Sequence, residues 1–163
     1  MIERIQATLE AIEVERGVRI LYAVESGSRA WGFASVDSDY DVRFLYMRPL
    51  KDYLRIDPPR DVIELPITEA LDVNGWDVFK ALKLFRSSNP PLLEWLFSPI
   101  IYREQGALAA SLRALARAHA SPRRMTYHYL SMARNNYKLY IAGRSEVNAK
   151  KYLYVLRPLL CIL

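Results

Sequence analysis

The segment Glu25–Tyr46, which reads ESGSRAWGFASVDSDYDVRFLY, decides the fold of this chain. A glycine-serine turn at its start is followed by aspartates at every second position, Asp37, Asp39 and Asp41. Residues two apart on a strand point to the same face, where like charges repel unless a cation neutralises them. Carboxylate oxygens with space for waters and phosphates are typical Mg²⁺ ligands. The segment therefore predicts a divalent-cation site where a strand begins.

Two other motifs share parts of this pattern and fail at named positions. An EF-hand loop also opens with alternating aspartates, but it needs a glycine where Val42 stands and a glutamate where Arg48 stands. A P-loop has the same spacing between its glycines, but Phe33 and Ala34 replace its lysine and hydroxyl residue. The remaining alternative is a structural turn rich in aspartate and serine at a hairpin.

Hydrophobic patterns over the rest of the chain predict an α+β fold, with strands in the first half and helices in the second. We expect a helix at 2–16 and strands at 18–24, 40–47, 61–67 and 69–73. We expect five helices afterwards, at 76–88, 89–99, 107–120, 125–142 and 147–163. In the first of these, the residues expected to face inward are Trp76, Phe79, Leu82 and either Leu84 or Phe85.

This pattern divides the chain into a part at 1–75, made of a helix and strands, and a helical region at 76–163. The last helix ends in apolar residues without a polar tail. An apolar helix end normally packs against something else. We therefore expect either a shortened form of a longer protein or a helix buried at an interface.

The composition is that of an ordinary globular protein of 163 residues, and no apolar run is long enough for a membrane span. One cysteine excludes an internal disulfide, and two histidines exclude a histidine-rich metal centre. These features favour the cytoplasm. The net charge is +5, and residues 106–157 carry ten basic side chains against Glu146 alone. This basic part favours a polyanionic partner, a nucleoside triphosphate or nucleic acid, although a solvated basic face is an equal alternative.

An apolar strand ending in Gly27-Ser28, followed by Asp39 and Asp41 at the start of a second apolar strand, resembles the polymerase-beta nucleotidyltransferase superfamily. Three longer segments extend the likeness over nearly the whole chain: GSRAWGFASVDSDYDVRFLY, DVNGWDVFKALKLFRSSNPPLLEWLFSPIIY and KKYLYVLRPLL. Together they look like the predicted nucleotidyltransferases associated with bacterial RNA-repair operons. The resemblance implies a polymerase-beta-like domain with a small mixed sheet and a helical C-terminal part.

The resemblance also implies roles for individual residues. Gly27 and Ser28 would bind phosphate oxygens of a nucleoside triphosphate, and Asp39 and Asp41 would ligate two Mg²⁺ ions, with Mn²⁺ as a substitute. A third carboxylate on a neighbouring strand would complete the metal site and act as the base. Asp72 has the apolar-acid-apolar setting of a strand and is preferred. The competitors are Asp77, whose place in the first turn of a helix has its own explanation, and Glu64.

Basic residues near these motifs are candidate ligands for the triphosphate or for a polynucleotide. They are Arg29 beside the glycine turn, Lys80 on the helix after Asp72, and Lys151 on the last helix. The expected reaction transfers a nucleoside monophosphate to a hydroxyl, for which an RNA end is a candidate, with release of pyrophosphate. The alternatives are a protein acceptor, as in toxin-antitoxin nucleotidyltransferases, and a non-catalytic nucleotide- or RNA-binding module. The sequence leaves open the base, the natural acceptor and the oligomeric state.

Overall fold

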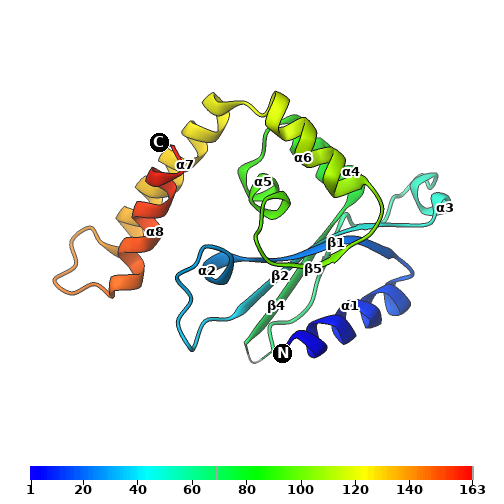
Figure 1. The fold of residues 1–163 in the computed structure, drawn as a ribbon, viewed down its shortest axis with the longest axis horizontal. Coiled ribbons are helices and arrows are strands. Elements are labelled where there is room, and N and C mark those ends of the chain that lie inside the picture. The colour runs from blue at the N-terminus through cyan, green and yellow to red at the C-terminus, as the bar shows by residue number, and fades with distance from the viewer. Residues whose placement is uncertain (69, 163) are drawn as a thin grey trace.

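The computed structural model describes residues 1–68 and 70–162 and has an α+β architecture built on one mixed sheet (Figure 1). The strands are β1 (Arg19–Ser26), β2 (Tyr40–Met47), β3 (Val62–Glu64), β4 (Leu71–Asp77) and β5 (Ile101–Glu104). Their order in the sheet is β3-β4-β2-β1-β5. Only the β2–β4 pair is parallel among the described strands.

The described helices lie on both sides of the sheet and beside it (Figure 1). They are α1 (Ile2–Arg16), α2 (Gly27–Ala30), α3 (Leu50–Tyr53), α4 (Val78–Arg86), α5 (Pro90–Leu96), α6 (Leu108–His119), α7 (Pro122–Tyr140) and α8 (Ala149–Leu160). None of these helices is long and apolar enough to cross a membrane.

Helix α1 covers one face of the sheet with an apolar stripe at helical spacing. Its buried residues Ile5, Leu9 and Ile12 belong to one core cluster with the β2 residues Val42 and Phe44. Alternation along β2 sends Val42 and Phe44 to this face, so Asp41 and Arg43 point to the other face. The first core layer thereby leaves the acidic motif on the side of the sheet away from α1.

The opposite face is only partly covered by α5 and α6. Tyr22 of β1 and Leu45 of β2 pack there against buried residues of these helices, and the Tyr22 hydroxyl donates to the Trp95 carbonyl at 3.0 Å. Trp76 of β4 stacks on Trp95 with ring centroids 3.8 Å apart. These apolar contacts lie toward the end of β2 and β4, so the residues at the start of both strands stay accessible.

The hairpin formed by α7 and α8 stands beside α2 (Figure 1). Asn148 caps α8 by accepting from the Lys150 amide. Arg157 anchors the helix, because its guanidinium pairs with Glu94 at 2.5 Å and lies 3.5 Å from the centroid of the Trp31 ring. The hairpin therefore brings the beginning of α8 to the glycine-serine turn.

Several predicted boundaries are wrong around β4. The strand continues to Asp77, so the helix expected from Trp76 begins at Val78. The Phe44 ring packs on Gly75, where a Cβ would lie 2.2 Å from the ring, and this contact holds β4 alongside β2. The next helix consequently turns another side toward the core: Ala81 is buried, whereas Phe79 and Leu82, which were expected to face inward, are 52% and 42% exposed.

The second part of the chain is not entirely helical, which corrects the expectation for residues 76–163. Its segment Ile101–Glu104 forms β5 and pairs with β1. Ile101 and Glu104 are exposed at this edge of the sheet, so the segment lacks the alternating apolar pattern of a half-buried strand. The expected division at residue 75 also falls within β4.

Candidate active site

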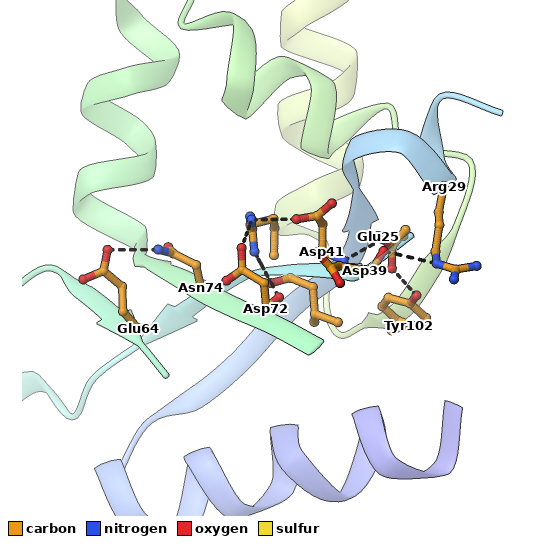
Figure 2. Close-up of polar contacts among 10 residues, drawn as sticks. Glu25, Arg29, Asp39, Asp41, Glu64, Asp72, Asn74 and Tyr102 are labelled. Atoms are coloured by element: carbon orange, nitrogen blue, oxygen red, sulfur yellow. Dashed lines mark hydrogen bonds and ion pairs between the residues drawn. The ribbon is translucent and has the colours of Figure 1, made fainter. Parts of the chain in front are cut away.

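The parallel register of β2 and β4 brings together carboxylates that are distant in the sequence. Asp41 and Asp72 are directly paired across the two strands, and Figure 2 shows their side chains on the same side of the sheet. Asp39 precedes Asp41 by two residues and is exposed. Burial raises the pKa of Asp41 above its ordinary value, and the charges of Asp72 and Asp39 raise that pKa further. The three predicted carboxylates therefore belong to one electrostatic cluster.

Gly27 lies directly against this cluster. Its φ of +65° is in the left-handed region that favours glycine, and a Cβ at this position would lie 2.1 Å from Oδ2 of Asp41. The contact brings the backbone of the glycine-serine turn to the edge of the carboxylate. Ser28, the next residue, is buried at the start of α2. The turn and the acidic motif thus form one continuous surface.

Glu25 is a supporting residue that the sequence analysis did not select. Its side chain is fully buried and accepts from the Asp41 amide at 2.7 Å and from the Tyr102 hydroxyl at 2.5 Å (Figure 2). Burial raises the pKa of the Glu25 carboxyl. The interaction fixes the backbone of Asp41 against β1. An acid within the apolar run LYAVES was the available signal, and its partner Tyr102 lies on the strand that the sequence did not reveal.

Arg29 supports the aspartate loop. Its guanidinium donates to the Ser38 carbonyl at 2.7 Å and to the Asp39 carbonyl at 3.2 Å, and it lies 3.8 Å from the centroid of the Tyr40 ring. Arg29, which was expected to bind phosphate, therefore directs these hydrogen bonds to backbone carbonyls of the loop. Arg29 thereby holds the backbone on which Asp39 is carried.

The other candidates for the third carboxylate lie elsewhere. Asp77 pairs in register with Tyr46 at the far end of β4, caps α4 through the Phe79 amide at 2.8 Å and accepts from Tyr53 at 2.9 Å. Glu64 lies on β3 and accepts from Asn74 at 3.1 Å (Figure 2). Among these three carboxylates, Asp72 is the one placed beside Asp41.

The predicted lysines do not meet at the carboxylates. Lys80 pairs with Asp61 at 3.2 Å and lines a separate pocket. The amine of Lys151 lies 4.1 Å from the centroid of the Tyr140 ring. Its neighbour Lys150 faces the site instead and donates to the Ser38 hydroxyl at 3.1 Å. Both lysines occupy the first turn of the same helix, so the sequence alone does not decide which one faces the cleft.

An open cleft of about 390 Å³ joins these elements. It is lined by Ser26, Gly27, Ser28, Trp31, Asp39, Asp41, Arg43, Asn136, Tyr140, Lys150 and Tyr154. Its volume lies within the range of about 300–1,000 Å³ that is usual for small-ligand sites. The cleft combines glycine-turn backbone, carboxylates, one lysine and aromatic rings, which suits a phosphorylated ligand with a base.

The donor set also suits a cation, although no group of three acidic, histidine or cysteine residues within 1–68 and 70–162 is arranged to enclose a metal ion. One guanidinium nitrogen of Arg43 lies 3.1 Å from Asp41 Oδ1 and 2.7 Å from Asp72 Oδ2. Two carboxylates of neighbouring strands therefore already share one positive group. Oxygen ligands that converge in this way fit Mg²⁺ or Mn²⁺.

The fold and the cleft define a class of α+β protein in which a glycine-serine turn meets carboxylates on paired strands. A family model described as "RNA repair pathway DNA polymerase beta family" (RlaP) matches residues 1–162, and the chain belongs to this family. This match confirms the resemblance to nucleotidyltransferases of RNA-repair operons. The printed description of the family refers to an RNA-repair pathway and to the DNA polymerase beta family.

A relative supports this relationship at the level of sequence. The chain is 54% identical over 160 residues to the "Uncharacterized protein YcgL" of Bacillus subtilis (strain 168). The match covers 98% of this chain and 61% of the relative, so the chain spans somewhat less than two thirds of the relative's length.

Proposed function

We propose that this protein is a metal-dependent nucleotidyltransferase that moves a nucleoside monophosphate from a nucleoside triphosphate to a hydroxyl at an RNA end, with release of pyrophosphate. The observation that carries the proposal is the register of β2 and β4, which sets Asp41 beside Asp72 and against Gly27. Membership of an RNA-repair family supports the choice of reaction and acceptor. The basic residues of α6, α7 and α8 agree with a polyanionic partner.

The triphosphate would occupy the cleft between the glycine-serine turn and α8. Backbone amides of a glycine turn can approach phosphate oxygens closely, and the Ser28 hydroxyl can donate to them. Lys150 would add a positive charge from the opposite wall, since its amine already reaches Ser38. Arg29 would act indirectly by keeping the Asp39 loop in place.

Asp39, Asp41 and Asp72 would hold two Mg²⁺ ions, and Mn²⁺ could replace them. When bound, such ions neutralise phosphate charge and align an in-line attack. Asp72 would also accept the proton of the attacking hydroxyl at a carboxylate oxygen. Glu25 would keep Asp41 in place through the amide contact, so that the carboxylates retain their spacing.

The test uses the purified chain with Mg²⁺, each labelled nucleoside triphosphate in turn, and an RNA pool with free 3′-hydroxyl groups. The variants are the Asp39→Ala, Asp41→Ala double variant and Asp37→Asn, which changes an exposed acid two residues before Asp39. Wild type and Asp37→Asn should label RNA, and the double variant should lose at least about 1,000-fold in rate, because phosphoryl transfer depends on charge neutralisation.

Two controls are needed to interpret the labelling experiment. The same RNA blocked by a 3′-phosphate should accept no label, and circular dichroism should show that the double variant is folded. Equal labelling by the double variant would contradict the assignment of the carboxylates. Absence of both transfer and Mg²⁺-dependent triphosphate binding in the wild type would contradict the proposed function itself.

A further inference from the structure

Arg43 occupies a position that the proposed metal ions would need. It lies two residues after Asp41 on β2 and points to the same face, opposite Asn74 in the parallel register. One nitrogen of its guanidinium bridges Asp41 and Asp72 at 3.1 Å and 2.7 Å. Figure 2 draws these two contacts as dashed lines to the carboxylates of Asp41 and Asp72. The two carboxylate oxygens that face each other are therefore both bound to one cation of the chain itself.

The second terminal nitrogen anchors this arrangement to the strands. It donates to the carbonyls of Val42 and Asp72, both at 3.1 Å. The Arg43 side chain is 17% exposed, and those of Asp41 and Asp72 are 27% and 29% exposed. Arg43 is thus a largely enclosed ion-pair partner, and its four described hydrogen bonds all go to the two strands that carry the carboxylates.

The Arg43 contacts offset the repulsion between two carboxylates on neighbouring strands. Directly paired like charges on neighbouring strands destabilise a sheet, and Asp41 and Asp72 are such a pair. One guanidinium nitrogen of Arg43, 3.1 Å from Asp41 Oδ1 and 2.7 Å from Asp72 Oδ2, offsets this repulsion. The guanidinium therefore stabilises the two strands in the same way that a bound cation would.

The same contacts oppose metal binding. A divalent cation held by the carboxylates of Asp41 and Asp72 would compete with Arg43 for them and would repel its charge. We propose that Arg43 is an internal counter-ion that holds the two carboxylates in the metal-free protein and is displaced from them by a divalent cation; this inference rests on the proposed function. Arg43 also lines the cleft beside Gly27 and Ser28, so the displaced guanidinium can pair with a phosphate oxygen.

This exchange couples the metal to the triphosphate. Metal alone must displace Arg43 without giving the guanidinium a new partner, whereas metal with triphosphate supplies one. The two ligands consequently favour each other's binding, and coupling between two sites must be reciprocal. Metal and nucleotide would then bind together. When either is absent, Arg43 would stay paired with Asp41 and Asp72.

The test compares wild type, Arg43→Gln and Arg43→Lys with Mn²⁺ as the probe, binding being measured by the electron paramagnetic resonance of free Mn²⁺. Arg43→Gln should bind Mn²⁺ about 10-fold more tightly without nucleotide, because the competing charge is gone. Arg43→Lys keeps the charge and should bind it with an affinity close to that of the wild type. Adding a non-hydrolysable triphosphate should strengthen Mn²⁺ binding more in the wild type than in Arg43→Gln.

Thermal unfolding provides the second readout. Without metal, Arg43→Gln should have a lower Tm than wild type, and Mn²⁺ should raise its Tm by more than it raises that of the wild type. The control is Arg103→Gln, which removes a comparable ion pair of 2.7 Å to Glu13, outside the cleft. This control should lower the Tm and leave the Mn²⁺ affinity unchanged.

The outcomes separate this inference from the proposed function. Unchanged or weaker Mn²⁺ binding by a folded Arg43→Gln variant would overturn the counter-ion role and leave the metal site standing. Absence of Mn²⁺ binding by the wild type and by both Arg43 variants at millimolar concentrations would overturn the metal site, and the proposed function with it.

Discussion

At the residue scale, the cleft depends on the close approach of Gly27 to Asp41. The turn can approach the carboxylate only because residue 27 has no side chain, and its positive φ adds a second reason for glycine. The resemblance to polymerase-beta nucleotidyltransferases implied that these two residues act together. The sequence did not predict that the Glu25 carboxylate would accept a hydrogen bond from the Asp41 amide.

The substitution Gly27→Ala tests this contact. The new Cβ would overlap Asp41 Oδ2, so we expect a loss of about 2–5 kcal/mol in the free energy of unfolding, from backbone strain and overpacking together. Triphosphate binding should be lost as well. Urea unfolding and nucleotide titration measure the two effects.

Gly32→Ala is the matched control. Gly32 also has a positive φ, of 81°, but beyond its chain neighbours a Cβ there would meet no atom of residues 1–68 and 70–162 within 4 Å. The variant should lose only the backbone contribution of about 1–2 kcal/mol and retain nucleotide binding. Equal effects of the two substitutions would show that contact with Asp41 does not matter.

At the scale of elements, the first turn of α8 decides which basic residue enters the cleft. Lys150 points to Ser38, and Lys151 packs on the rings of Tyr140 and Tyr154. The choice depends on how α8 is anchored, since Arg157 fixes the helix against Glu94 and Trp31. A neighbouring pair of lysines can therefore have two separate functions.

We predict that Lys150→Ala weakens triphosphate binding about 10-fold or more, because it removes a charged hydrogen-bond donor from the phosphate side of the cleft. Lys151→Ala should instead lower the free energy of unfolding by about 0.5–2 kcal/mol, because Lys151 and the two rings it contacts are partly buried, and should leave the affinity unchanged. Isothermal titration and thermal unfolding of both variants distinguish these effects. A greater loss of affinity in Lys151→Ala than in Lys150→Ala would show that Lys151, which the sequence suggested, is the lysine that binds the triphosphate.

At the scale of the whole molecule, the sheet joins distant parts of the chain. Strand β5 pairs with β1 across about half the sequence, and α5 and α6 cover the β1 and β2 residues Tyr22, Val24 and Leu45. The α7–α8 hairpin lies beside this unit (Figure 1). Its residues Asn136, Tyr140, Lys150 and Tyr154 line one side of the cleft.

This architecture predicts different behaviour for two fragments. Residues 1–75 should not fold alone, because the second apolar face of the sheet would lose its cover and β4 would be cut before its end. Residues 1–120 retain the sheet with α1, α4, α5 and α6, and should unfold cooperatively but bind triphosphate weakly without Lys150. Amide spectra and urea unfolding of both fragments, beside the full chain, test this. A well-dispersed spectrum of 1–75 would show that the division at residue 75 is a true domain boundary.

The sequence by itself determined the α+β class, the helix at 2–16, the strand at 40–47 and the pairing of a glycine-serine turn with Asp39 and Asp41. These features are local, since they follow from hydrophobic periodicity, turn residues and the spacing of charges. The family resemblance implied a third carboxylate, and the local pattern favoured Asp72 over Asp77 and Glu64 for it.

Only the tertiary structure decided how these residues meet. Parallel pairing of β2 with β4 set Asp72 beside Asp41, the packing of Phe44 on Gly75 accompanied a longer β4, and the anchoring of α8 turned Lys150 rather than Lys151 toward the cleft. Glu25 and Arg43 gained their roles from partners on other strands, Tyr102 and Asp72. Strand register and helix docking are set by contacts between distant segments, and a local pattern does not contain them.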